Sequence, residues 1–184
     1  MKTKIFIMAL VAFAWHACQQ NAGSTEAKAQ EQTSTVGQDA VVDNDSQKDV
    51  VKIAVGSKDH TTLVAALKQA DYVKDLSNAG PFTVFAPTNE AFAKLPKETL
   101  DNLMKNENKA QLQNILEYHV SVGVYKEEYM SDGQAINQVN LKNITINIKD
   151  GKMMVNNSAN VVATIPASNG IIYVVDAVLL PPAN

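Results

Sequence analysis

Residues 82–92, with the sequence FTVFAPTNEAF, constrain the fold of this chain more than any other stretch. The stretch begins with alternating side chains of the types that suit a pleated strand. Pro87 cannot donate a ladder hydrogen bond, so we expect the strand to end there. Thr88 then stands where a helix N-cap is favoured, and Glu90 falls in the first turn, where a carboxylate is favoured. The stretch therefore predicts a strand that turns directly into a capped helix.

Aromatic side chains on both elements predict that this corner builds the core. Phe85 belongs to the strand and Phe92 to the helix, where Ala91 and Leu95 supply the other apolar positions. Pro96 ends the helix by disfavouring helical geometry at Leu95. These features predict a structural role for the corner and give no indication of a catalytic or ligand-binding site.

The spacing of apolar residues predicts further helices around the corner. Leu63, Ala66, Leu67 and Ala70 recur at i, i+3, i+4 and i+7, and Asp49 is suited to cap an earlier helix. The expected helical segments are residues 49–54, 63–70, 71–76, 97–104 and 109–118.

From residue 120 the apolar period changes to two, which predicts strands at residues 144–148, 153–155, 161–165 and 171–175. Asp150-Gly151 has the composition of a type I′ hairpin turn, and Asn169-Gly170 predicts a second tight turn. The last strand is nearly all apolar, as a strand buried on both faces would be. Helices followed by strands predict an α+β fold, with an antiparallel sheet and helices packed on one side.

Three motifs stand out: residues 83–96, TVFAPTNEAFAKLP, residues 164–181, TIPASNGIIYVVDAVLLP, and the pair Tyr118-His119 between them. The first two resemble the two signatures of the fasciclin domain family, an extracellular adhesion module. Tyr118-His119 resembles the tyrosine–histidine pair of that family. The likeness spans residues 49–181 and implies a wedge-shaped antiparallel β-sandwich with a packed layer of short α-helices. The structural residues that it singles out are Phe85, Pro87, Thr88, Phe92, Asn169, Gly170 and Asp176.

The tyrosine–histidine pair has two interpretations. In animal relatives it is implicated in receptor contact, so the resemblance makes Tyr118 and His119 a candidate partner-binding site. His119 also closes the apolar stripe of the helix expected over residues 109–118, which favours a buried histidine hydrogen-bonded to a backbone carbonyl. Both interpretations remain open from the sequence. Asn169, by contrast, is interpreted as a turn residue and not as a partner contact.

Residues 1–17 have the pattern of an export signal, with Lys2 and Lys4 before an apolar run that is too short for a permanent membrane span. Cleavage before Cys18 would resemble bacterial lipoprotein processing, in which the cysteine becomes the acylated N-terminus. The alternative is ordinary cleavage after Ala29, which would leave Cys18 as an incidental leader residue. We expect Cys18 to be lipidated.

Residues 18–48 are expected to form the lipidated N-terminus and a flexible linker, because polar residues dominate and aromatic residues are absent. Such a linker would lift a domain formed by residues 49–184 off a membrane surface, although a tail without any role has the same composition. The expected location is the cell envelope, in the outer membrane or at the cell surface through the lipid. Without the lipid, the protein would be secreted or periplasmic.

Composition argues against several functional classes. Sixteen Lys and Arg against nineteen Asp and Glu give a slightly acidic chain, so we expect no nucleic-acid partner. His60 and His119 lack zinc-ligand spacing, and neither a nucleophile elbow nor a phosphate loop is present. We therefore expect no catalytic residue, metal or cofactor. The expected function is adhesion to cell-surface or extracellular-matrix components, protein or polysaccharide, with a module for a polysaccharide or small apolar ligand as the alternative.

Overall fold

The structure, a computed structural model, describes residues 48–182. No helix among these residues has both the length and the apolar character needed to cross a membrane. Its α-helices are α1 (Val50–Gly56), α2 (Thr61–Gln69), α3 (Val73–Leu76), α4 (Asn89–Ala93), α5 (Lys97–Leu103) and α6 (Lys109–Glu117). Short 3₁₀ turns occur at η2 (Lys58–His60), η3 (Asn106–Asn108) and η4 (Glu127–Tyr129).

The strands form one hydrogen-bonded series in the order β2-β1-β7-β6-β5-β4-β3. They are β1 (Phe82–Pro87), β2 (Val120–Val122), β3 (Ala135–Asn137), β4 (Asn143–Lys149), β5 (Lys152–Val155), β6 (Ala159–Ala167) and β7 (Gly170–Val175). The predicted α+β class is confirmed. The sheet is not wholly antiparallel, because β1 and β7, the two signature strands, run parallel in the register Phe82↔Gly170 to Pro87↔Val175.

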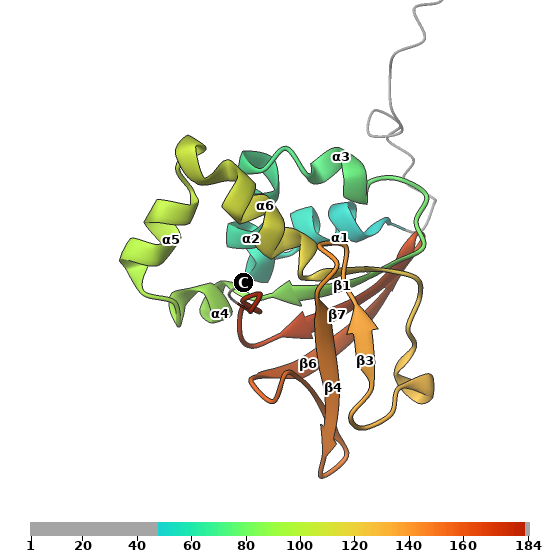
Figure 1. The fold of residues 1–184 in the computed structure, drawn as a ribbon. Helices are drawn as coiled ribbons and strands as arrows, with labels where there is room; N and C mark the ends of the chain where they lie inside the picture. Colours follow the sequence, from blue (N-terminus) through green and yellow to red (C-terminus); the bar gives the residue numbers. More distant parts are fainter. Residues whose placement is uncertain (1–47, 183–184) are drawn as a thin grey trace, which may run out of the picture. The chain divides into compact units, whose positions relative to one another are not determined.

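The two central strands each serve two cores, because successive side chains of a strand point to opposite faces. In β1, Val84 packs with the helices and Phe85 packs within the sandwich; in β7, Ile172 and Tyr173 divide in the same way. Figure 1 shows the helices gathered on one side of the strands and β3 and β4 crossing over β6 and β7. The sheet therefore folds back on itself as a sandwich, and the helices cover its outer face.

The helix-side core contains Val50, Val51, Leu63, Ala66, Leu67, Ala70, Tyr72, Leu76, Val84, Ala86, Phe92, Leu103, Leu112, Ile115, Leu116, Val120, Ile172 and Val174. The sandwich core contains Phe85, Tyr118, Met130, Ile136, Ile144, Ile146, Met153, Val155, Ala159, Tyr173, Val175 and Leu179.

The predicted strand-to-helix corner is present with the predicted ends. β1 ends at Pro87, and Thr88 caps α4 by accepting a hydrogen bond from Ala91 N at 3.1 Å. The buried ring of Phe92 packs in the helix-side core, and Pro96 lies between α4 and α5. This corner formed as expected because each of its determinants acts over only a few residues.

Of the two predicted hairpin turns, one is confirmed and the other lies one residue earlier than expected. Asp150 and Gly151 have φ values of 50° and 72°, the left-handed pair that a type I′ turn requires, so that prediction is confirmed. The second turn is shifted by one residue: Ala167 pairs with Gly170, so Ser168 and Asn169 form the turn and Gly170 begins β7.

The helix expected from residue 71 begins only at Val73, since Asp71 has a positive φ of 55°.

Candidate functional site

His119 lies at the centre of the fold and is only 3% exposed. Its Nδ1 donates to Ile115 O at 2.8 Å, and its Nε2 accepts from Leu179 N at 3.0 Å. Because Nε2 acts as an acceptor here, the ring is the neutral tautomer. Burial lowers the pKa of His119 to about 4, against a weaker opposing effect of the Ile115 carbonyl.

Tyr118 is equally enclosed, with 2% exposure, in the sandwich core. Its hydroxyl donates to Asn143 O at 3.0 Å and accepts from Asn156 Nδ2 at 3.1 Å. The two side chains therefore diverge from the end of α6 into opposite layers, and their polar atoms bond within the chain. Neither side chain reaches the protein surface, so a partner could contact Tyr118 and His119 directly only if both side chains left the core.

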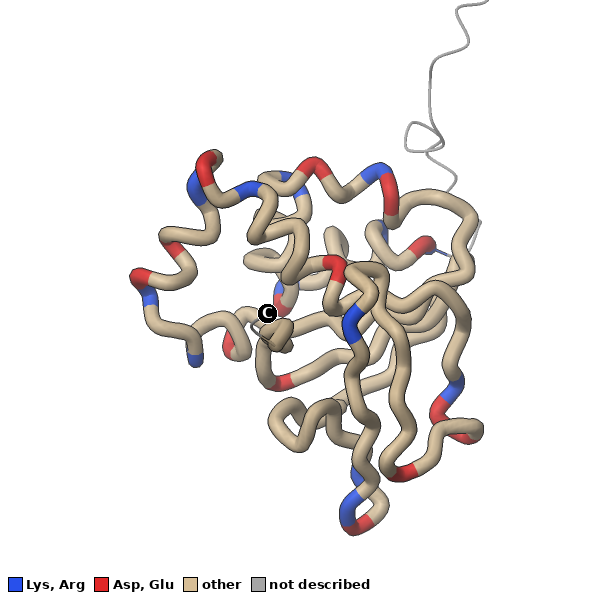
Figure 2. The backbone as a smooth tube through the Cα atoms, in the orientation of Figure 1, with Lys and Arg blue, Asp and Glu red and all other residues tan. Residues whose placement is uncertain are grey.

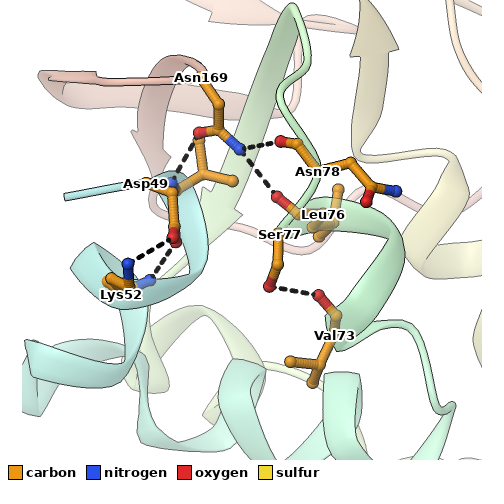
Figure 3. Close-up of polar contacts among 8 residues, drawn as sticks. Asp49, Lys52, Val73, Leu76, Ser77, Asn78 and Asn169 are labelled. Atoms are coloured by element: carbon orange, nitrogen blue, oxygen red, sulfur yellow. Dashed lines mark hydrogen bonds and ion pairs between the residues drawn. The ribbon is translucent and has the colours of Figure 1, made fainter. Parts of the chain in front are cut away.

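Asn169 holds together segments that are far apart in the sequence (Figure 3). Its side-chain oxygen accepts from Val50 N at 2.9 Å, and its amide nitrogen donates to Leu76 O at 2.9 Å and Asn78 O at 2.8 Å. Its backbone oxygen accepts from Phe82 N at 3.0 Å. The interpretation of Asn169 as merely a turn residue is therefore incomplete: it is a buried clamp that joins the start of α1, the end of α3 and the start of β1.

Glycine is required at position 170 because the backbone of Phe82 approaches it closely, and not because of the tight turn that the sequence predicted there. A Cβ at this position would lie 2.0 Å from Phe82 O and 2.8 Å from Phe82 C. Phe82 and Gly170 are the first partners of the parallel ladder between β1 and β7. A side chain here would force the two central strands apart.

The remaining signature residues also make internal contacts. The Phe85 ring stacks on Tyr173 with centroids 5.6 Å apart. Asp176 accepts from Asn160 N at 2.7 Å and from Asn160 Nδ2 at 2.9 Å, and Lys94 Nζ lies 3.7 Å from its carboxylate. Partial burial raises the pKa of Asp176, but the hydrogen bonds from Asn160 and the charge of Lys94 outweigh this effect and lower it overall.

Residues 122–130 form the surface feature that sequence reasoning missed. Val122, Val124 and Tyr129 are exposed in this segment, and Tyr129 is 76% exposed. Thr83 Oγ1 donates to Gly123 O at 2.7 Å and accepts from Tyr125 N at 3.0 Å. The signal available in the sequence was the alternation VSVGVY after His119, in which the outward valines have no predicted partner.

An open hollow of about 600 Å³ lies beside the 122–130 segment. It is lined by Val124, Lys126, Glu127, Glu128, Pro166, Gly170 and Ile171. The Tyr173 hydroxyl donates to Tyr125 O at 2.7 Å, so the segment is fastened to β7 as well as to β1. The apolar side chains of this hollow are thus exposed on a backbone that the sheet holds in place.

The charge distribution fits contact with a mixed surface better than contact with a polyanion. Figure 2 shows acidic and basic residues interspersed over helices and hairpin tips, with no continuous band of either sign on the face in view. Among residues 48–182, no three His, Cys, Asp or Glu side chains are grouped so that they could hold a metal ion. Cys18 and the export signal lie outside the described residues.

Known proteins with similar sequences and structures place these features in one family. A family model described as the fasciclin domain matches residues 58–181. Protein sll1483 of Synechocystis sp. is 41% identical over 183 residues, covering 99% of this chain and 99% of its own. Cell surface glycolipoprotein MPB83 of Mycobacterium bovis is 41% identical over 112 residues, covering 60% of this chain and 48% of its own.

A solved structure, the FAS1 domain pair of the insect cell adhesion molecule Fasciclin I, matches the fold with a TM-score of 0.64 and 19% identity. The match covers 72% of this chain and 51% of that one. The two stretches that resemble the family signatures form the β1–α4 corner and the β6–β7 hairpin, which meet in the parallel ladder. The predicted resemblance is confirmed, and the chain belongs to the fasciclin domain family.

Proposed function

We propose that this protein is a lipid-anchored module outside the cytoplasm that binds cell-surface or extracellular-matrix components, without catalysis or metal. The observation that carries the proposal is the fixed apolar surface of the 122–130 segment and its hollow. Exposed apolar patches on a soluble domain often mark contact sites. Thr83 and Tyr173 hold the backbone of this patch, so binding would not require the segment to be ordered first.

The relatives support the surface location. MPB83 is described as a cell surface glycolipoprotein, and the solved structural match comes from a cell adhesion molecule. In the present chain, a short apolar leader precedes Cys18, and a polar tract follows it. The proposal assigns the cysteine to the lipid anchor and the polar tract to the tether.

Weak single contacts would suffice for such a module. A standard specific protein interface buries roughly 1,600 Å² in total, an area that a domain of this size can present. Many anchored copies facing one surface would bind together, so avidity would exceed the affinity of each contact.

A polysaccharide partner is the second candidate, and the exposed ring of Tyr129 favours it because sugars pack on aromatic faces. A small apolar ligand does not fit the enclosed apolar cavity that is lined from α2, β1, α4, α5 and α6. This cavity measures about 20 Å³, which is room for about one water.

The test compares binding of monomeric and artificially dimerised protein to cell surfaces and to extracellular matrix, with and without EDTA. The dimer should bind markedly more strongly, and EDTA should leave binding intact. Val124→Asp should weaken binding, whereas Val55→Asp, at an exposed position of α1, should not. Loss of binding in EDTA, equal effects of the two variants, or turnover of a substrate by the monomer would contradict the proposal.

Tyr129→Ala separates the two partner classes. Loss of binding to purified envelope polysaccharide with retained binding to surface protein would assign Tyr129 to a sugar site. Loss of protein binding alone would assign it to a protein interface.

A further inference from the structure

Asn169-Gly170 is the only asparagine–glycine pair in the 184-residue chain, and Asn169 is only 6% exposed. The side chain of an asparagine is open to attack by the backbone nitrogen of the residue that follows it. Glycine in the following position favours this attack, because it has no side chain to obstruct the approach and restricts the backbone least. The residue that clamps the domain is therefore also the asparagine with the highest intrinsic reactivity of this kind.

The reaction converts the side-chain amide into a carboxylate. The backbone nitrogen of Gly170 attacks Cγ of Asn169, and the new bond between them closes a succinimide ring. The Gly170 nitrogen loses its proton, and the side-chain nitrogen of Asn169 leaves as ammonia. Water then opens the ring at one of its two carbonyl carbons. The product is either aspartate or isoaspartate, in which the main chain runs through the former side-chain carbon.

In the folded domain the side-chain amide of Asn169 is held by three hydrogen bonds. Its oxygen accepts from Val50 N, and its nitrogen donates to Leu76 O and to Asn78 O. Attack at Cγ turns the planar amide carbon into a tetrahedral one and draws it toward the backbone. The reaction therefore requires the bonds that clamp α1, α3 and β1 together to break (Figure 3).

The peptide group between Asn169 and Gly170 is held as well. Asn169 O accepts from Phe82 N at 3.0 Å. A Cβ on Gly80 would lie 2.2 Å from Asn169 O, and a Cβ on Gly170 would lie 2.0 Å from Phe82 O. Because the backbone is packed this closely on both sides, the peptide group cannot rotate to bring Gly170 N onto Cγ unless β1 moves away.

We propose that Asn169-Gly170 is a covalent modification site that reacts only when the clamp opens, and whose reaction prevents the clamp from closing again. An aspartate at position 169 would have no hydrogen to donate, so it would place a carboxylate against the carbonyl oxygens of Leu76 and Asn78. Isoaspartate would lengthen the main chain in the two-residue turn between β6 and β7 and displace β7 along β1. A domain that has been opened for long enough is thereby marked and kept from refolding.

An exposed asparagine in another turn supplies a matched control. Asn157 is exposed, lies in the turn between β5 and β6, and is followed by the exposed Ser158. The variant Ser158→Gly gives position 157 the same following residue as Asn169, but without a clamp. The two positions then differ mainly in how the fold holds them, and both are measured in the same molecule.

The experiment follows both positions in the full chain, wild type and Ser158→Gly, at mildly alkaline pH. Each protein is incubated folded, and unfolded in guanidinium chloride above its unfolding midpoint. Peptide mapping by mass spectrometry gives the rate of conversion at each position, and an isoaspartate methyltransferase labels the isoaspartate product. After removal of the denaturant, limited proteolysis separates refolded chains from chains that stay unfolded.

We expect position 157 of the folded Ser158→Gly protein to react about tenfold or more faster than Asn169, because Asn169 reacts only from an opened state. In denaturant the two rates should become similar. Chains converted at Asn169 should stay sensitive to protease, whereas chains converted only at position 157 should refold. Asn169→Asp should lower the melting temperature, and Asn157→Asp should leave it unchanged.

Three results would overturn the inference. They are equal rates at Asn169 in the folded and unfolded chain, a rate at position 157 of the folded Ser158→Gly protein no higher than that at Asn169, and full refolding of chains converted at Asn169. All readouts are masses, proteolysis and melting temperatures of the isolated protein. Failure of the proposed surface binding would therefore leave this inference intact, and its own failure would leave the surface binding intact.

Discussion

The backbone N–H of Leu179 donates to Nε2 of His119 at 3.0 Å, which ties the segment after β7 to the end of α6. That bond exists only while the imidazole is neutral, since a protonated ring has no acceptor. The position of the C-terminal segment therefore depends on the charge state of one buried side chain.

We predict that the domain loses stability in mild acid. The pKa of His119 is about 4 in the folded state, below the ordinary value of 6.5. The unfolded chain therefore binds the proton first, and stability that is complete above pH 6.5 is lost as the pH falls toward 4. The difference corresponds to about 3 kcal/mol of unfolding free energy. His60, whose pKa burial also lowers, contributes in the same direction.

Urea unfolding at several pH values between 7.5 and 4.5 measures this loss. His119→Leu should be less stable at pH 7.5 but should lose less stability over the same range. Asp176, whose pKa is lowered from 3.8, acts at more acidic pH and should not contribute to this window. An unchanged pH dependence in His119→Leu would refute the assignment.

In the β1–α4 corner, loss of the Thr88 cap should lower the free energy of unfolding less than loss of the Phe92 ring. Phe92→Ala should cost about 3–5 kcal/mol because it empties a buried site in the helix-side core. Thr88→Ala should cost about 1 kcal/mol through the lost bond to Ala91 N. Urea melts of both variants test this, and a Phe92→Ala protein as stable as wild type would show that the ring does not pack as described.

The Asn169 clamp should be sensitive to small changes. Asn169→Ala removes three side-chain hydrogen bonds and leaves Val50 N and two carbonyls unpaired, which should cost about 2–4 kcal/mol. Ser168→Ala, at the exposed neighbouring turn position, should change stability by less than about 0.5 kcal/mol. Thermal melts compare the two, and similar losses would mean that the turn, and not the clamp, is the sensitive feature.

Two glycines should respond to alanine in opposite ways. Gly170→Ala should cost about 3 kcal/mol or more, because its Cβ would overlap the Phe82 carbonyl. Gly56→Ala has no atom within 4 Å of its Cβ and should be neutral or slightly stabilising. Denaturant midpoints of both variants decide the matter; a stable Gly170→Ala protein would require a looser β1–β7 ladder than the one described.

The N-terminus gives a chemical prediction. We expect mass spectrometry of the membrane fraction to find Cys18 acylated and first in the mature chain. Cys18→Ser should release the protein from the membrane fraction without changing the thermal melt of the domain. An unmodified soluble protein that begins at Gln30 would rule out the anchor.

Sequence reasoning succeeded where the determinants are close together. Pro87, Thr88 and Pro96 end or begin elements through their own backbone chemistry, and Asp150-Gly151 adopts the only common turn that its composition favours. The helix stripes and strand alternation likewise depend on neighbours a few residues away. These features are sufficient to predict the α+β class.

The features that were not predicted from the sequence depend on contacts between residues that are distant in the sequence. The three groups bonded by the Asn169 side chain are 119, 93 and 91 positions away, so no local pattern distinguishes a buried clamp from a turn. The parallel pairing of β1 with β7 likewise joins the two signature strands across the whole domain. The surface of residues 122–130 was missed because its exposure depends on Thr83 and Tyr173, which hold it from other strands.

The β6–β7 turn also determines how the domain would resist force. At the start of the described chain, Lys48 O accepts a hydrogen bond from Ser168 N at 3.1 Å. Two residues after Lys48, Val50 N donates to Oδ1 of Asn169 in the same turn. A pull on the N-terminal side therefore reaches β7, which has β1 and β6 on either side, and not an edge strand. We expect single-molecule pulling from the N-terminal side to detach residues 48–56 before the sheet yields, so that the start of the domain limits the force that reaches the paired strands.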